Sequence, residues 1–256
     1  MVYTEEQLQR YSRQIAMKDV GIAGQKRLTA GRVLVIGAGG LGSAALMYLA
    51  AAGVGTLGIA DHDTVNLSNL ERQILHRTSR LGRAKTASAI ETLRDINPDP
   101  RLIPYPIKIT SENILETIQS YDIVLDCTDQ FANKLLVNDA CVAAQKPFVH
   151  AGVLESSGQV MTWRPGPWPC LRCLMGDIPL KDETNAASGV LGAAVGVISS
   201  IQALEAIKFL LGRGELLTGR MLHFNGMNMT FSETVLPEKS PYCRACGTPP
   251  AVRSLP

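Results

Sequence analysis

The strongest constraint on the fold is a glycine-rich turn between an apolar run and a helix-forming segment. Residues 32–36 form a short β-branched run, typical of a buried parallel strand, and residues 41–52 have helical composition. Between them, Gly37, Gly39 and Gly42 have the spacing G-x-G-x-x-G. Such glycines permit a tight turn and a close backbone approach, and the N-terminus of the following helix attracts phosphate. The turn therefore predicts a nucleotide site, without indicating which nucleotide.

Strand-like and helix-like segments alternate over roughly residues 30–150. After the first strand, apolar runs predict strands at 56–60, 102–107, 122–125 and near Phe148. Helical composition predicts helices at 81–96, where Asn97-Pro98 is the stop, near 111–118 and at 131–144. This β-α-β-α order predicts a parallel sheet with helices on both faces.

The pattern differs on either side of this region. Thr4 and Gln7 form a capping-box pattern, which predicts a helix that runs to about Met17. After Gly152, the sequence predicts strands at 158–163, 220–224 and 229–235, and a long apolar helix within 189–212. The predicted fold class is therefore α/β, a Rossmann-like parallel-sheet core with an antiparallel C-terminal extension of the sheet.

Composition excludes several classes of protein. Hydrophobic residues make up 46% and charged residues 19%, which are values of globular rather than disordered chains. A net charge of +2 argues against binding to nucleic acid or to an anionic membrane through bulk charge. Gln202, Glu205 and Lys208 interrupt the apolar helix before the roughly 20 residues of a membrane span. Because the N-terminal segment is polar and unlike a signal peptide, we expect a cytoplasmic protein.

A charged segment follows the second expected strand. Asp61 ends that strand, where a dinucleotide-binding fold places the carboxylate that holds ribose hydroxyls, which favours an NAD-dependent oxidoreductase as the first hypothesis. Arg72 and Lys85 follow closely, however, and hydride transfer does not need such cations near the phosphates. A reaction that builds negative charge at phosphorus does need them. The remaining interpretation is a solvated charged loop.

Two further carboxylates follow the expected strand at 122–125. Asp126 and Asp129 lie at its carboxyl end, where open α/β sheets bind their ligands. From its position, Asp129 is a candidate ligand for magnesium. Asp126 has the simpler interpretation of a residue that caps the turn.

The six cysteines divide into two groups. Two C-x-x-C pairs lie 70 residues apart, and four thiolates of this kind suit a closed tetrahedral zinc site that clips a loop to the C-terminal segment. A zinc module that binds nucleic acid is the alternative, but the neighbouring sequence is not basic enough. Cys127 and Cys141 are interpreted as small packing residues. The four zinc ligands, which complete the predicted fold class, are Cys170, Cys173, Cys243 and Cys246.

Together these motifs resemble the MoeB/ThiF/HesA family, the bacterial relatives of ubiquitin-activating enzymes. The shared segments are GAGGLG, the D-x-D-x-V-x-x-S-N-L-x-R-Q run from Asp61, Lys85, DCTD, the two C-x-x-C pairs and QALEAIKFLLG. The resemblance covers almost the whole chain, from Tyr11 to the last cysteine pair. The combination of motifs is far more specific to this family than the glycine turn alone.

The resemblance implies an ATP-dependent adenylyltransferase. Members of the family bind ATP with magnesium and the C-terminal Gly-Gly carboxylate of a ubiquitin-like sulfur-carrier protein of the ThiS/MoaD type. The carboxylate attacks the α-phosphate to give an acyl-adenylate and pyrophosphate, and sulfur is then delivered to make a thiocarboxylate for thiamine, molybdopterin or a secondary pathway. This chemistry needs positioning and charge stabilisation but no general base, because the nucleophile is already a carboxylate.

The resemblance also assigns roles to residues of this chain. Arg13 matches an arginine that reaches into the neighbouring subunit's site, which implies a homodimer. Arg13, Arg72, Lys85 and Asp129 are the implied catalytic residues. Asn69, Arg72 and Lys85 are implied to bind the phosphates, Asp129 to hold magnesium, and Asp61 to hold the ribose. The implied nucleotide-binding set is Gly37, Gly39, Gly40, Gly42, Asp61, Asp63, Ser68, Asn69, Arg72, Gln73, Lys85, Asp129 and Gln130.

The chain departs from the family pattern in three places. ThiF-like members carry a cysteine in the loop before the apolar helix that can link to the carrier, and Asn185 stands there instead. Gln130 replaces the usual Asn after the magnesium aspartate. No rhodanese-like segment follows Gly247, so a separate sulfur donor protein is expected. Core or surface roles rather than catalysis are expected for His62, His76, His150 and His223.

The implied organisation is a single ubiquitin-activating-enzyme-like adenylation domain over residues 1–247. Its nucleotide-binding half covers 30–150, and its carrier-binding, zinc and dimer half covers 151–247. The tail at 248–256 is expected to be flexible, and the polar loop 176–188 to be mobile before the carrier binds. Three alternatives stay open: adenylation of another carboxylate or of a modified tRNA base, an NAD-dependent oxidoreductase, and a non-catalytic dimeric scaffold.

Overall fold

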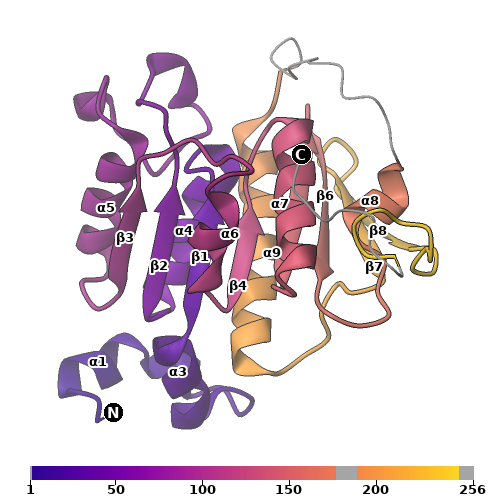
Figure 1. Cartoon of the computed structure of the whole chain (residues 1–256). Coiled ribbons are helices and arrows are strands. Elements are labelled where there is room, and N and C mark those ends of the chain that lie inside the picture. The colour runs from indigo at the N-terminus through magenta and orange to yellow at the C-terminus, as the bar shows by residue number, and fades with distance from the viewer. Residues whose placement is uncertain (1, 177–188, 248–256) are drawn as a thin grey trace.

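A single eight-stranded sheet forms the centre of the protein, in the order β3-β2-β1-β4-β5-β6-β7-β8 (Figure 1). The computed structural model describes residues 2–176 and 189–247. The strands are β1 (Arg32–Ile36), β2 (Thr56–Ala60), β3 (Arg101–Tyr105), β4 (Ile123–Asp126), β5 (Phe148–Leu154), β6 (Ser157–Trp163), β7 (Arg220–Asn225) and β8 (Thr230–Val235). The α-helices are α1 (Glu5–Arg10), α2 (Ser12–Ile15), α3 (Gly21–Ala30), α4 (Gly40–Ala51), α5 (Lys85–Ile96), α6 (Ile114–Gln119), α7 (Phe131–Ala143), α8 (Leu171–Met175) and α9 (Gly192–Leu211).

The sheet changes direction at β5, as the sequence predicted. Strands β3, β2, β1, β4 and β5 are parallel, with Val33 opposite Leu57 of β2 and Ile123 of β4. Strands β6, β7 and β8 then add antiparallel pairs, and the tight reversal from β5 to β6 places Leu154 opposite Ser157. Parallel strands end at a common edge of the sheet, so the loops after β1, β2 and β4 converge there.

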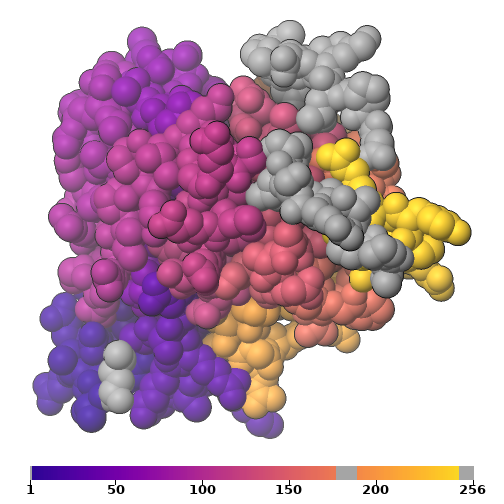
Figure 2. All heavy atoms as spheres, viewed as in Figure 1, coloured from indigo at the N-terminus to yellow at the C-terminus, as the bar shows by residue number. Residues whose placement is uncertain are grey.

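Helices cover both faces of the parallel strands and divide the core in two. Apolar side chains of α4, α5 and α9 pack on one face, around Leu46, Leu93 and Ile198. Those of α6 and α7 pack on the other face, around Ile118 and Cys141. Figure 1 shows α6 and α7 in front of the sheet and α9 behind it. In the space-filling view from the same side, side chains in the colours of α6 and α7 cover this face of the sheet (Figure 2).

The expected N-terminal helix begins at its capping box but breaks at Tyr11. Thr4 and Gln7 form the reciprocal cap, whereas Tyr11 has a non-helical ψ of 7° between α1 and α2. Its side chain is buried, and its hydroxyl donates to Asp99 at 2.7 Å and accepts from the Asn97 amide at 2.8 Å. The break directs the Tyr11 ring into the core. The sequence around Tyr11 does not predict this, because the partners Asp99 and Asn97 lie 88 and 86 residues away.

The helix expected at 81–96 begins four residues later than predicted. Gly82 has a φ of +80°, which an α-helix cannot contain, and a 3₁₀ turn, η2 (Thr78–Arg80), precedes it. The backbone N–H of Lys85 instead donates to the Asp63 carbonyl at 2.9 Å. The first residue of α5 is therefore attached to the loop that follows β2.

Two helices, α3 and the short α8, are not predicted by the sequence patterns. The α3 segment contains Gly21 and Gly24 and is only weakly amphipathic, so its own sequence hardly favours a helix. Contacts with the rest of the chain hold it: Gln25 donates to the Ala52 carbonyl at 2.9 Å, and the Gly55 N–H donates to the Leu28 carbonyl at 3.0 Å.

The long apolar helix α9 lies in the core. By length and composition it could cross a membrane, but half of its apolar window is buried inside the protein. It packs against α4, β5 and β6, and buried Gln202 and Glu205 make hydrogen bonds within the core. These contacts are those of the core helix expected from the sequence. The predictions for Asn185, for the loop within 177–188 and for the tail 248–256 lie outside the described residues.

Gly55→Ala is expected to destabilise the protein by about 2 kcal/mol or more. The added Cβ would lie 1.8 Å from the Thr29 carbonyl oxygen, at a contact between two backbones that fixes α3 against the start of β2. Gly196→Ala in α9 is the matched control, because nothing lies within 4 Å of its Cβ position, and alanine stabilises a helix by about 0.5–1 kcal/mol. Urea unfolding followed by circular dichroism measures both. Equal unfolding midpoints would contradict the proposed role of this contact.

Candidate functional site

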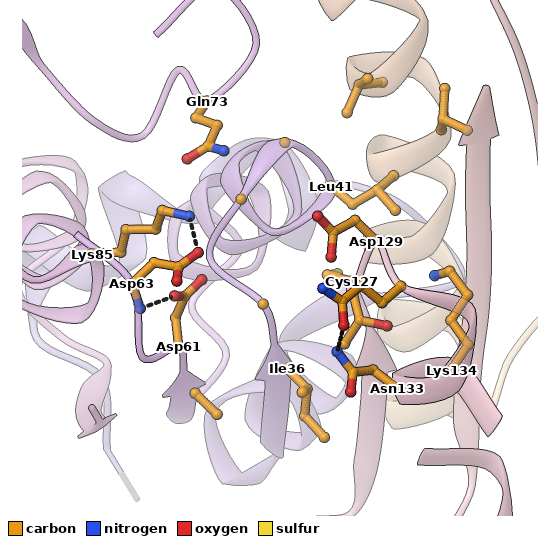
Figure 3. A pocket seen from close by; sticks show the side chains of 18 of the residues that line it. Ile36, Leu41, Asp61, Asp63, Gln73, Lys85, Cys127, Asp129, Asn133 and Lys134 are labelled. Atoms are coloured by element: carbon orange, nitrogen blue, oxygen red, sulfur yellow. Dashed lines mark hydrogen bonds and ion pairs between the residues drawn. The ribbon is translucent and has the colours of Figure 1, made fainter. Parts of the chain in front are cut away.

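A cavity of about 620 Å³ lies at the carboxyl ends of β1, β2, β4 and β5. This volume is within the usual range for small-molecule sites. Figure 3 shows the glycine turn running between two groups of polar side chains, with Asp61, Asp63 and Lys85 on one side and Asp129 on the other. The predicted residues that line the cavity are Gly37, Gly39, Gly40, Asp61, Asp63, Arg72, Gln73, Lys85, Asp129 and Gln130.

The glycine turn is built by two positions that exclude any side chain. Gly37 has a φ of +99°, and a Cβ there would lie 2.6 Å from the Cys127 carbonyl oxygen. A Cβ on Gly42 would lie 1.9 Å from the Gly37 carbonyl oxygen. The turn leads directly into α4, whose N-terminus is capped by none of the described side chains. Its free N–H groups and the helix dipole make this end of the cavity attractive to an anion.

Asp61 locks the turn to the end of β2. One carboxylate oxygen accepts from the Ala38 N–H at 2.8 Å, and the other accepts from the Asp63 N–H at 2.8 Å. Each carboxylate oxygen retains a lone pair, so this half-buried group can also accept hydrogen bonds from hydroxyls of a ligand.

Lys85 and Asp63 form one wall of the cavity, and Arg72 also lines it. Buried Lys85 donates to Asp63 at 2.9 Å, and half-buried Arg72 pairs with Glu71 and donates to the Ser68 carbonyl at 3.1 Å. Burial raises the pKa of Asp63, but the hydrogen bond and charge of Lys85 outweigh it and leave that pKa below its usual value. The ionised Asp63 therefore fixes the Lys85 ammonium at the cavity.

The opposite wall contains Asp129, which is exposed at the turn between β4 and α7. In the part of the chain that the structure describes, its carboxylate has no hydrogen-bond or ion-pair partner. A free carboxylate at the cavity is suited to a divalent cation, because magnesium prefers carboxylate oxygen as a ligand.

His76 was predicted to be a core or surface residue, and the structure connects it to the glycine turn. It is buried, with Nε2 2.9 Å from the Ala38 carbonyl oxygen and Nδ1 3.0 Å from the Ser88 hydroxyl. Burial lowers its pKa, so the ring is neutral and its Nε2–H donates to Ala38. No local sequence pattern identifies this role, because its partners lie 38 and 12 residues away.

Four predicted site residues do not line the cavity. Gly42 packs beneath the turn, and the carbonyls of Ser68 and Asn69 accept hydrogen bonds from Arg72 and Gln73. Arg13 is exposed on α2, outside the cavity of its own chain. Lining residues without a predicted role include Thr128, Asn133, Lys134 and Val195.

The four predicted zinc ligands form one cluster. The sulfur atoms of Cys170 and Cys243 lie 3.7 Å apart, those of Cys173 and Cys246 lie 3.3 Å apart, and all four lie within 4.8 Å of one another. Tetrahedral zinc with bonds of about 2.3 Å places its sulfurs about 3.8 Å apart. Hydrogen bonding from the Cys170 thiol lowers the pKa of the Cys173 thiol. The cluster fits a zinc ion.

Comparison with known proteins gives consistent matches over almost the whole chain. The model of the ThiF family matches residues 11–245. The adenylyltransferase and sulfurtransferase MOCS3 of Aedes aegypti is 43% identical over 97% of this chain, and that of Sus scrofa is 41% identical over 98%. The chain spans only 57% and 56% of the lengths of these two relatives.

Solved structures share the fold. The crystal structure of Escherichia coli MccB with ATP has a TM-score of 0.81 and 23% identity, covering 93% of this chain and 73% of that one. The structure of MccB with AMPCPP and MccA has a TM-score of 0.82 and 23% identity, covering 96% and 75%. At this level of identity the likeness concerns architecture, and it agrees with the sheet described above. The family match over residues 11–245 settles the relationship: the chain belongs to the ThiF family.

Proposed function

We propose that the protein is an ATP-dependent adenylyltransferase that activates the C-terminal carboxylate of a ubiquitin-like sulfur-carrier protein. One observation carries the proposal: a single cavity brings together an uncapped helix N-terminus, Arg72, Lys85 and the free carboxylate of Asp129. Hydride transfer does not require that arrangement, whereas a crowded polyphosphate does. Two of the relatives at 41–43% identity are named adenylyltransferases, which supports the same conclusion.

The geometry supports one orientation of the nucleotide. Asp61, with a lone pair left on each oxygen, is assigned to the ribose hydroxyls. The glycine turn and the N-terminus of α4 are assigned to the phosphates, with Arg72 and Lys85 beside them. Asp129 and Gln130 face the phosphates from the other wall, and Asp129 would hold magnesium, which would neutralise part of their charge.

The proposed reaction is a displacement at the α-phosphorus. A carboxylate oxygen of the carrier forms a bond to that phosphorus, the bond to the oxygen that bridges the α- and β-phosphates breaks, and pyrophosphate leaves with the electron pair. No proton moves, so the protein has to position the reactants and stabilise negative charge. Lys85 suits this work, because burial strengthens its field and Asp63 fixes its ammonium group.

The proposal also includes the sulfur-carrier protein that is adenylated and the homodimer in which the reaction takes place. The C-terminal half, residues 151–247, is assigned to carrier binding and to a homodimer within a single domain that covers 1–247. Arg13, exposed outside its own cavity, is assigned to the site of the neighbouring subunit. The reaction is placed in the cytoplasm, where a reduced site of four cysteines is stable.

A separate protein is proposed to supply the sulfur. Outside the zinc cluster, the structure describes two cysteines, Cys127 and Cys141, and both are buried. Burial raises the pKa of each thiol far above its usual value, which disfavours the nucleophilic thiolate. Neither residue is therefore suited to carry sulfur, and both are buried packing residues, as expected from the sequence.

Lys85→Ala is expected to lower carrier-dependent exchange of pyrophosphate into ATP by about 100-fold or more, the usual effect of removing one group that stabilises transition-state charge. Arg83→Ala is the matched control, because Arg83 lies two residues away, pairs with Glu91 and does not line the cavity. Exchange is measured with purified carriers that end in Gly-Gly. Absence of exchange by the unmutated protein with every such carrier would refute the proposed function.

Removal of zinc is expected to lower the melting temperature, because the metal clips α8 to the segment that contains Cys243 and Cys246. Elemental analysis should find about one zinc per chain, and Cys243→Ser should lose most of it. The double variant Cys127→Ala and Cys141→Ala is the control and should retain both zinc and pyrophosphate exchange. Full zinc content in Cys243→Ser would contradict the assignment of the cluster.

A further inference from the structure

One buried charge behind the cavity wall takes no part in the proposed reaction. Asp126 ends β4 and is completely buried, three residues before the exposed Asp129. From the sequence, only a turn-capping role was expected for it. Its contacts extend well beyond the turn, to two other elements of the fold.

The Asp126 carboxylate accepts hydrogen bonds from four donors. Oδ1 accepts from the Thr128 N–H at 3.2 Å and from the Thr128 hydroxyl at 2.7 Å. Oδ2 accepts from Nδ1 of His150 in β5 at 2.9 Å and from the ammonium of Lys134 in α7 at 3.3 Å. One side chain thus joins the end of β4, the next turn, the first part of α7 and the neighbouring strand.

The charges in this cluster are balanced. Burial alone would raise the pKa of Asp126, but the charge of Lys134 and the hydrogen bond from His150 lower it to about 2. Burial lowers the pKa of His150, so its ring is neutral and donates through Nδ1–H. Lys134 also donates to the Ala151 carbonyl at 2.6 Å. The cluster therefore contains one buried ion pair and a neutral histidine that orients it.

The same segment is held from a third side by α9. The Gln202 amide donates to the backbone carbonyls of Asp126 and Val149, at 3.0 and 3.2 Å. The Cys127 thiol lies 3.5 Å from the Gln202 side-chain oxygen. Residues 126–128 are therefore fixed by β5, α7 and α9, and Asp129 follows immediately. Figure 3 shows Cys127, Asp129 and Lys134 together on this wall of the cavity.

Stability alone does not account for this arrangement. A buried ion pair contributes little net stability compared with apolar residues of the same size, since desolvation offsets the attraction between the charges. The ion pair instead fixes the orientation of the Asp126 carboxylate. The Oδ1 atom of that carboxylate accepts from both the N–H and the hydroxyl of Thr128, and so fixes Thr128. Fixing Thr128 fixes the peptide bond that leads into Asp129.

We propose that Asp126, oriented by His150 and Lys134, is a positioning residue that presents the Asp129 carboxylate to the divalent cation bound with the nucleotide. This inference rests on the proposed function, because it assumes a nucleotide–magnesium complex in the cavity. Asp126 and His150 act through Asp129 and do not contact the ligand. A purely structural cluster would affect melting temperature without affecting the linkage between magnesium and nucleotide.

Calorimetric titration of a non-hydrolysable ATP analogue, with and without MgCl₂, tests the proposal on the intact protein. His150→Leu removes the donor to Asp126 and should reduce the magnesium-dependent gain in analogue affinity by about fivefold, a value typical of one lost hydrogen bond. Affinity for the metal-free analogue should not change. His150→Asn is the matched control, because its amide nitrogen can occupy the place of Nδ1 and should restore the gain.

Asp129→Asn supplies the reference for this test. It should remove the magnesium-dependent gain, and His150→Leu should then have no further effect in the Asp129→Asn background. An unchanged gain in His150→Leu, or an equal loss in both backgrounds, would overturn the inference while leaving the proposed function intact. An unmutated protein that fails to bind the analogue in either condition would overturn both.

A second pair of variants covers the case in which His150→Leu does not fold. Thr128→Val removes one donor to Asp126 with almost no change in shape, and Thr128→Ser retains the hydroxyl. The valine variant should lose part of the magnesium-dependent gain, and the serine variant should keep it. Equal gains in these two variants would also contradict the inference.

Discussion

The close backbone contact inside the glycine turn is the constraint on which the rest of the site depends. The Cα of Gly42 sits against the Gly37 carbonyl, where a Cβ would lie only 1.9 Å from that oxygen. This contact lets α4 begin with only three residues separating it from the end of β1, so that its free N–H groups face the cavity. Asp61 and His76 then hold the intervening Ala38 by its N–H and its carbonyl. The turn is therefore fixed before any ligand arrives, and little conformational entropy remains to be lost on binding.

The arrangement of charge explains why a nearly neutral protein can have a strongly directional site. The chain has a net charge of +2, but Arg72 and Lys85 both line the cavity, and Asp129 lies across the glycine turn from Lys85. The carboxylates near the cations are already engaged, since Asp63 holds Lys85 and Glu71 holds Arg72. Asp129 has no such partner among the described residues, which leaves it able to bind a cation. Engaged and free carboxylates thus have different roles at the same edge of the sheet.

The sequence predicted the features that depend on short, regular patterns. The β-branched runs located the strands of the parallel sheet, and the glycine spacing located the cavity, because both signals are local. The helix α3 was missed because its stability comes from Gln25 and Gly55 contacts rather than from its own glycine-containing sequence. His76 and Lys134 were missed as site residues for the same reason. Their partners, Ala38 and Asp126, are identified only when the chain is folded, and no spacing rule connects them.

The helix α7 explains how the cysteine cluster and the cavity can belong to one rigid arrangement. Near its start, Lys134 lines the cavity and pairs with Asp126. Further along the helix, Asp139 accepts two hydrogen bonds from the Nε and one from the terminal nitrogen of Arg172, which lies between two of the zinc ligands. Such multiple contacts within a buried pair restrict its orientation more than a single contact does. Through Arg172, the cysteine cluster therefore contacts the same helix whose first turn, at Asn133 and Lys134, lines the cavity beside Asp129. The first C-x-x-C pair and the DCTD segment, far apart in the sequence, therefore both contact α7, through Arg172 and Asp126.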